Sequence, residues 1–231
     1  MKKLAHVFFL CVLTWTMLLT GCSGGGSGKT ATPVVLEPTQ AIPINTLEVW
    51  YQEGFSDSHI GWELSTAGYH TEGDYSNGEL VLTRLNNLRS TYSYARPHLT
   101  FDNFVLEMDG RWAGGAVGGQ YGILFRYSDA DNYYRFQIGN DGWYTLGKQT
   151  KGNWFPLLQG FSKEILRDGV YNRFHIEAVG NEIRCFVNNQ YLGGVQDDDH
   201  TLGDIVLAAW LPEGTENFHA AFDNLVVAIA P

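Results

Sequence analysis

Five side chains between residues 126 and 154 have the chemistry that sugar recognition uses. They are Arg126, Tyr133, Arg135, Trp143 and Trp154. An aromatic ring packs on the apolar C–H surface of a sugar, and a guanidinium group donates hydrogen bonds to hydroxyl groups. The alternative interpretation is that most of these rings fill the core of a large β-protein. We predict a ligand-binding face that includes these five residues, and we predict no catalytic residue.

Other patterns that could carry catalysis or bind a metal are weak in this chain. The sequence contains no Gly-x-Ser-x-Gly, no His-Glu-x-x-His and no phosphate-binding loop. Its most charged stretch, residues 197–200, reads Asp-Asp-Asp-His. Carboxylates suit hard cations, but three adjacent Asp side chains on an extended chain cannot all point at one ion. A solvated loop between two strands is therefore the favoured interpretation.

The N-terminus has the pattern of a secretory signal peptide. Lys2 and Lys3 precede an apolar run that extends to Leu19, and the run is short for a membrane span. The run ends in Leu-Thr-Gly-Cys, which resembles the lipobox of bacterial lipoproteins. This resemblance implies removal of residues 1–21 and lipidation of Cys22. It also implies an extracytoplasmic, membrane-anchored protein, in the outer membrane or at the cell surface depending on the host.

Composition separates a tether from a folded domain. Residues 22–45 are rich in Gly and Ser and then contain three prolines, which is typical of a flexible or extended spacer. Residues 46–231 are long enough for one domain with its own core. The formal net charge is −10, and loss of the two lysines of the signal peptide takes it to −12. Nucleic acid is excluded as a partner, because phosphate binding needs clustered basic residues.

Alternating side chains predict strands over most of this domain. Between residues 133 and 138, three apolar side chains (Tyr134, Phe136, Ile138) alternate with three more polar ones (Tyr133, Arg135, Gln137). A period of two is typical of half-buried strands, and turn signals such as Asn77-Gly78 separate the runs. Roughly 12–14 strands at spacings of about 8–12 residues predict an all-β, antiparallel, two-sheet jelly-roll sandwich.

Several motifs in chain order also carry a family resemblance. They include residues 53–57 with Gly61 and Trp62, residues 77–80, 122–127, 131–134, 152–154, 172–174, 187–189 and 222–224. Together they resemble the concanavalin A-like, laminin G-like jelly rolls, and most closely the bacterial domains related to the 3-keto-disaccharide hydrolase family. The resemblance covers nearly the whole chain after the tether.

The resemblance implies two further candidate sites. Related endoglucanases carry three acids on one strand as Glu-x-Asp-x-(x)-Glu, and the nearest match here is Glu107 and Asp109 without the third acid. The favoured interpretation is that these two polar residues lie on the solvent side of a strand and that Met108 points inward. Similar sandwiches hold a structural calcium ion near the last strand. Carried over, the metal site would contain Asp223, Glu53 and Gly78, while a hydrogen-bonded Asp223 without calcium is the alternative.

These observations predict a lipid-anchored β-sandwich module that binds carbohydrate or another surface polymer and has no catalytic activity of its own. Membrane contact is expected through the lipid anchor only. One alternative is a glycoside hydrolase acting on a keto-disaccharide or a glucan, which requires a carboxylate pair. The other is a structural or protein-interaction lipoprotein of the cell envelope.

Overall fold

The computed structural model describes residues 34–56, 62–64, 72–84, 92–211 and 216–231. Residues 33–231 form one compact unit. Cys22, the predicted signal peptide and the first part of the predicted tether lie outside the described residues. In the described part of the chain, no helix is long and apolar enough to cross a membrane.

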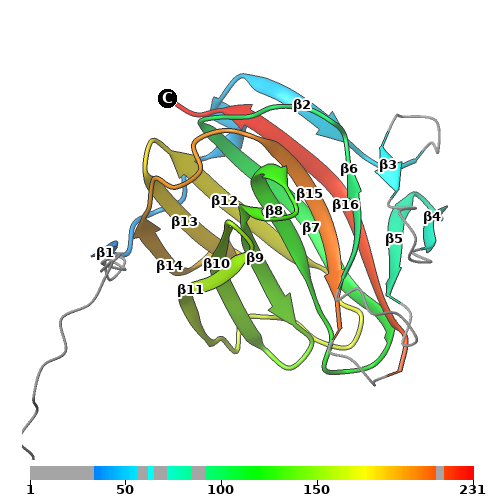
Figure 1. Ribbon diagram of the computed structural model, residues 1–231. Helices are drawn as coiled ribbons and strands as arrows, with labels where there is room; N and C mark the ends of the chain where they lie inside the picture. Colours follow the sequence, from blue (N-terminus) through cyan, green and yellow to red (C-terminus); the bar gives the residue numbers. More distant parts are fainter. Residues whose placement is uncertain (1–33, 57–61, 65–71, 85–91, 212–215) are drawn as a thin grey trace, which may run out of the picture. The chain divides into compact units, whose positions relative to one another are not determined.

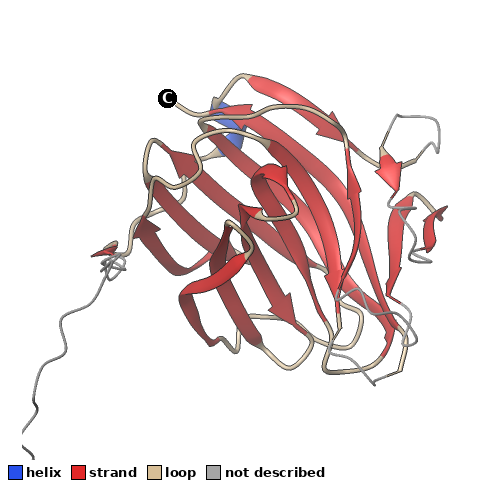
Figure 2. Ribbon diagram, in the orientation of Figure 1, coloured by secondary structure: helices blue, strands red, loops and turns tan. Residues whose placement is uncertain are grey.

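The unit is built from two antiparallel sheets (Figures 1 and 2). In the nine-stranded sheet the order is β1 (Val34–Val35), β14 (Gln190–Gln196), β13 (Glu182–Val187), β12 (Asn172–Val179), β7 (Phe104–Gly115), β16 (Phe218–Ile229), β5 (Glu79–Arg84) and β4 (Glu72–Ser76), and β2 (Val49–Glu53) also pairs with β16. In the seven-stranded sheet the order is β11 (Asn153–Phe161), β10 (Trp143–Thr150), β9 (Asn132–Gly139), β8 (Gln120–Asp129), β15 (Asp204–Trp210), β6 (Tyr92–Arg96) and β3 (Glu63–Leu64). The predicted all-β jelly-roll sandwich is confirmed.

One apolar core lies between the sheets because alternate side chains of each strand point inward. From the seven-stranded sheet, Tyr134, Phe136 and Ile138 are fully buried, as the alternation predicts. From the nine-stranded sheet, Phe174 packs edge-on against Phe136 with ring centroids 5.8 Å apart. Such aromatic contacts add to the free energy gained by removing apolar surface from water.

The described residues contain 16 strands, more than the 12–14 that the pattern predicts. Two of the additional strands, β1 and β3, have two residues each and are too short to produce an alternation. The tight turns agree with the sequence. Asn77 and Gly78 join β4 to β5 with φ of 57° and 80°, and a two-residue hairpin turn needs positive φ at both positions.

The folded unit begins earlier than the predicted boundary at residue 46. β1 pairs with β14, and a short 3₁₀ helix, η1 (Ile44–Thr46), follows before β2. Composition predicts a spacer here, because Gly, Ser and Pro disfavour regular structure. It does not reveal that backbone groups of residues 34–47 find partners on the nine-stranded sheet.

Candidate functional site

The outer face of the seven-stranded sheet carries a row of small or narrow side chains that crosses four strands. Ala208 on β15 lies opposite Gly122 on β8, Gly122 lies opposite Gln137 on β9, and Gln137 lies opposite Thr145 on β10. These positions share the outer face because the residues between them point into the core. Ala208, Gly122 and Gln137 of this row line a pocket on the outer face.

Larger side chains stand on both sides of this row. On one side, Trp210 lies opposite Gln120, whose amide accepts a hydrogen bond from Gln137. On the other side, Leu124 lies opposite Arg135. We call the row and its two walls the trough. Its centre is a narrow pocket lined by Gly122, Leu124, Tyr133, Arg135, Gln137, Ala208 and Trp210, among others, and no Asp or Glu of the described chain lines it.

Three of the five predicted binding residues meet at one wall of the trough. The Arg135 guanidinium lies over the Trp154 ring, 4.0 Å from the ring centroid, in a cation–π contact. Tyr133 stacks on Tyr127 with ring centroids 5.8 Å apart, and only 4% of Tyr133 is exposed. Burial raises the pKa of Tyr133, so its hydroxyl stays protonated at neutral pH and can donate a hydrogen bond.

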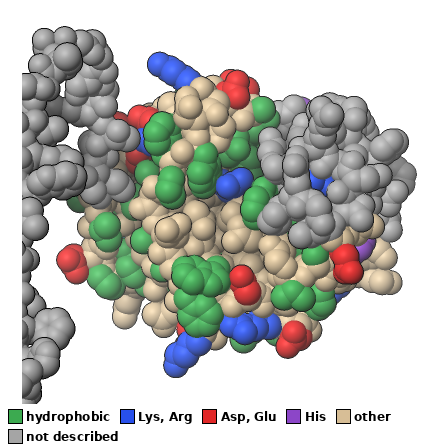
Figure 3. Space-filling view, turned by 60° about the horizontal axis from the view of Figure 1, so that its bottom comes forward, with side chains coloured by type: hydrophobic (Ala, Val, Ile, Leu, Met, Phe, Trp, Pro, Cys, Tyr) green, Lys and Arg blue, Asp and Glu red, His purple; other side chains and the backbone are tan. Residues whose placement is uncertain are grey.

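Trp143 lies at the far end of β10 from this wall. The Trp154 ring lies against Gly147, and Trp143 is four residues further along, a distance of about 13 Å in a strand. Half of Trp143 is exposed, and its ring contacts Phe161 edge-on at 6.2 Å. Figure 3 turns the bottom of Figure 1 toward the viewer, and this surface carries several separate hydrophobic clusters with basic side chains beside them. Trp143 therefore shares the outer face but lies apart from the Arg135 wall.

Arg126 does not belong to this face. Only 1% of it is exposed, and its guanidinium donates hydrogen bonds of 3.0–3.2 Å to the backbone carbonyls of Asp102, Gly180 and His200. The β8–β9 register shifts after Phe125, and Arg126 has a φ of 48°, so simple alternation fails at this position. In the structure Arg126 joins three loops, which contradicts its predicted role on the binding face.

Most residues of the trough are absent from the five that the sequence predicts, including the two that form one of its walls. Trp210 lies on β15, and Gln120 begins β8, 90 positions earlier in the chain. Their own strands show the alternation that would place them on an outer face. Only the pairing of β15 with β8 brings them beside Gln137, and that pairing is a long-range feature.

Comparison with known proteins identifies the domain. The family model of 3-keto-alpha-glucoside-1,2-lyase-like domains matches residues 46–225. The chain belongs to this family. A search of curated protein sequences finds no match.

Solved structures related to this lyase-like domain share its fold at low sequence identity. The carbohydrate-binding module CBM66 from Bacillus subtilis superposes with a TM-score of 0.59 and 15% identity, over 74% of this chain and 97% of that chain. A β-glucanase from Bacillus licheniformis superposes with a TM-score of 0.58 and 16% identity, over 78% of this chain and 98% of that chain. An endo-β-galactosidase from Clostridium perfringens superposes with a TM-score of 0.64 and 8% identity, over 82% of this chain and 64% of that chain. At these identities the comparison establishes the jelly-roll fold alone.

The acids that the resemblance singles out lie on the other sheet of the lyase-like domain. Glu107 on β7 accepts hydrogen bonds from His175 at 3.0 Å and Arg173 at 2.8 Å, and both partners lower the pKa of its carboxyl. Arg173 also pairs with Asp109 at 3.2 Å, while Met108 is fully buried between the two acids. These carboxylates are paired with cations on the outer face of the nine-stranded sheet, and Met108 points inward, as the interpretation of two polar residues on the solvent side expects.

The predicted calcium ligands make other contacts. The Asp223 carboxylate accepts hydrogen bonds from the backbone and side chain of Asn224, and the Glu53 carboxylate accepts one from the backbone of Phe55 at 2.8 Å. Gly78 serves the β4–β5 turn. In the parts that the structure describes, no group of three acidic, His or Cys side chains is arranged to hold a metal ion.

Alternation is wrong at Asp223 for the same reason as at Arg126. It predicts that Asp223 shares a face with Leu225. However, Asn224 has a φ of 51°, and the pairing of β16 with β7 shifts between Asp223 and Val226. This bulge puts Leu225 into the core and leaves Asp223 partly exposed.

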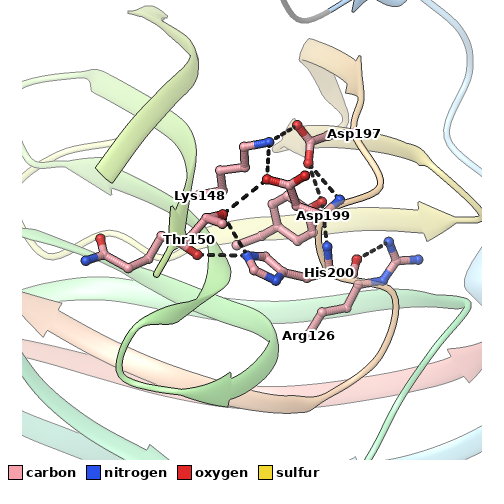
Figure 4. A network of polar contacts seen from close by, with 8 residues as sticks. Arg126, Lys148, Thr150, Asp197, Asp199 and His200 are labelled. Carbon is pink, nitrogen blue, oxygen red and sulfur yellow. Dashed lines mark hydrogen bonds and ion pairs between the residues drawn. The ribbon is translucent and has the colours of Figure 1, made fainter. Parts of the chain in front are cut away.

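The acidic stretch 197–200 binds a cation of the protein itself (Figure 4). Lys148 on β10 forms ion pairs with both Asp197 and Asp199, and the Tyr134 hydroxyl donates to Asp197. His200 approaches the Gln149 carbonyl at 2.7 Å through Nε2. Burial alone lowers the pKa of Lys148, but the two carboxylates outweigh it and leave the pKa raised. The network fixes the loop between β14 and β15 to the seven-stranded sheet.

Proposed function

We propose that this protein is a lipid-anchored, extracytoplasmic module that binds a glycan in the trough and has no catalytic activity of its own. The lipid anchor is inferred from the Leu-Thr-Gly-Cys pattern at Cys22. The glycan is inferred from the family, from carbohydrate-related proteins of the same fold, and from the chemistry of the trough.

One observation carries the binding proposal. A row of small side chains crosses the sheet between aromatic and hydrogen-bonding side chains, namely Trp210 on one side and Arg135 with Trp154 on the other. Sugar sites combine aromatic surface with a few placed polar groups. The trough offers both, and it offers no carboxylate for acid–base chemistry among its described lining residues.

A glycan array followed by calorimetry tests this proposal. Trp154→Ala should abolish selective binding while the protein still melts cooperatively. Trp50 supplies the control, because it is an exposed tryptophan on the other sheet, away from the trough. Trp50→Ala should bind normally. A well-folded wild-type domain that binds no glycan would refute the proposal and favour a protein partner in the envelope.

The family description supports a second candidate, cleavage of a 3-keto-glucoside. The assay is incubation with a 3-keto-α-glucoside and chromatography of the released alcohol or sugar. Release that Trp154→Ala abolishes would establish an enzyme and would place the reaction at the trough. Binding of the intact compound without release supports the non-catalytic module.

A further inference from the structure

Residues 34–47 lie across the outer face of the nine-stranded sheet. The Leu36 N–H donates to the Gly194 carbonyl at 2.8 Å, and the Tyr191 hydroxyl donates to the Leu36 carbonyl at 2.9 Å. Further along, the Ile42 N–H donates to Glu177 Oε1 at 2.6 Å, and η1 lies against β7. The segment therefore runs from the β14 edge over β12 to β7 before β2 begins (Figure 1).

Few apolar contacts hold this segment. None of its side chains is fully buried, and Val34 and Val35 are 57% and 63% exposed. Segments with little buried apolar surface open at low free-energy cost, long before the whole domain unfolds. The polar contacts therefore have a large share in deciding whether residues 34–47 stay docked.

A buried charged group lies beneath the central contact. His175 is 5% exposed and Glu177 is 2% exposed. His175 Nε2 lies 3.2 Å from Glu177 Oε1, the same oxygen that accepts the Ile42 N–H. On its other side, His175 Nδ1 lies 3.0 Å from Glu107 Oε1. The imidazole thus bridges two carboxylates, and one of them holds residues 34–47.

We infer that residues 34–47 form a latch that is docked through Glu177 and controlled by the charge of His175. A protonated imidazole donates from both ring nitrogens and satisfies Glu107 and Glu177 together. A neutral imidazole has one N–H, so its other nitrogen turns a lone pair toward a carboxylate. In either tautomer the buried Glu177 loses its cationic partner, and opening of the latch lets water hydrate the carboxylate.

The other ionisable groups around His175 either have partners of their own or are uncharged. On β12, Arg173 binds Glu107 and also Asp109 of β7, and on β13 Arg184 is paired with Glu182. The Phe186 ring packs edge-on against the imidazole, and Tyr191 of β14, next to Phe186, has a raised pKa and is neutral at physiological pH. Glu177 has no arginine or lysine ion pair within the described residues, so His175 is its cationic partner.

The direction of the pH effect follows from the pKa of His175. Burial alone lowers this pKa, but Glu107 and Glu177 outweigh burial and leave it above its ordinary value. A raised folded-state pKa stabilises the docked form below the unfolded value of about 6.5, and the stabilisation is lost as pH rises through the folded value. The latch is therefore docked while His175 is protonated, and it is released as the pH rises through the raised pKa of His175.

The latch sets the length of any tether, a consequence that rests on the lipid anchor proposed above. With the latch docked, residues 23–33 separate Cys22 from the folded unit. As a coil, these residues have a reach of about 17–20 Å. With the latch released, residues 23–48 separate the two, and the reach becomes about 26–31 Å. The docking itself does not depend on the anchor.

Spin-label mobility tests the latch. The sample is a chain that begins at Ser23, which lacks Cys11 and Cys22 and keeps the whole compact unit. Its native Cys185 is fully buried, so a nitroxide label reports only the new cysteine of Thr39→Cys, an exposed position in the latch. Gln159→Cys on β11 is the control site. Between about pH 6 and pH 9 the label at residue 39 should lose its immobile component, and the control label should not.

Two variants separate charge control from simple packing. Glu177→Gln keeps an oxygen for the Ile42 N–H and offers an N–H to a neutral imidazole, so the latch should stay docked at both pH values. His175→Gln should give the same mobility at both pH values. An unchanged spectrum of the wild-type latch across this range, or the same pH response in His175→Gln, would overturn the inference. Neither result depends on glycan binding.

Discussion

Replacement of Arg126 by alanine separates a structural role from the binding role that the sequence predicts. Its guanidinium donates to three backbone carbonyls in three different loops, those of Asp102, Gly180 and His200. Hydrogen bonds that involve a charged group contribute about 1.5–3 kcal/mol each. Water will hydrate part of the gap left by the side chain. We therefore expect a loss of about 4 kcal/mol, somewhat below the sum of about 4.5–9 kcal/mol for three such bonds.

Urea denaturation and thermal melting measure this loss. For a domain of this size, about 4 kcal/mol corresponds to a decrease in melting temperature of about 8–16 °C. Arg126→Lys keeps a charge but loses the planar fork, so its stability should fall between those of wild type and Arg126→Ala. Arg167→Ala is the matched control, because Arg167 is exposed and donates to one carbonyl, that of Asp141. It should change the free energy of unfolding by less than about 0.5 kcal/mol.

An Arg126→Ala variant that melts like the wild type but loses ligand binding would refute the structural role. That result would mean that the three carbonyls are satisfied without the guanidinium and that Arg126 reaches a ligand. A strongly destabilised variant that still binds glycan at low temperature supports the structural role.

Three further substitutions or probes test other parts of the structure. Lys148→Met should destabilise the domain by about 2 kcal/mol in urea at pH 7, since Asp197 and Asp199 lose their shared cation, and the loss should shrink in acid as the carboxyls protonate. Asp223→Asn should leave the free energy of unfolding unchanged or slightly higher. Burial and neighbouring acids raise the Asp223 pKa, which means that they disfavour its charged form. A melting temperature that rises with calcium in the wild type but not in this variant would instead establish a metal site. Cys185 should resist a thiol reagent until the protein unfolds, because burial raises its pKa far above neutrality.

Local alternation explains how much of the sandwich is predictable from sequence. On β9, the order of Tyr133, Tyr134, Arg135 and Phe136 assigns each side chain to a face before any pairing is known, and the structure agrees. The reason is that side-chain direction in a strand depends on neighbouring residues alone. The wall formed by Tyr133, Arg135 and Trp154 follows from this pattern and the two hairpin turns that join β9, β10 and β11.

Bulges and long-range pairing explain what the sequence does not reveal. Arg126 and Asn224 both have positive φ beside a register shift, and each shift changes which side chains face the core. Arg126 is not of a type that favours positive φ, and Asn224 tolerates it without specifying a bulge, because bulges depend on how a strand fits its neighbours. Trp210 meets Gln120 only through strand pairing, and Ile42 meets Glu177 across 135 positions of sequence.

The two outer faces of the sandwich differ in how their polar groups are used, and this difference favours the trough as the ligand site. On the nine-stranded sheet, Glu107, Arg173 and His175 bind one another, and the latch takes up Glu177. A ligand there would have to displace paired charges, and desolvating them again is costly. On the seven-stranded sheet, the pocket between Trp210 and the Arg135–Trp154 pair has no Asp or Glu among its described lining residues. A neutral, ring-shaped ligand such as a sugar therefore meets the lower free-energy cost on the seven-stranded sheet.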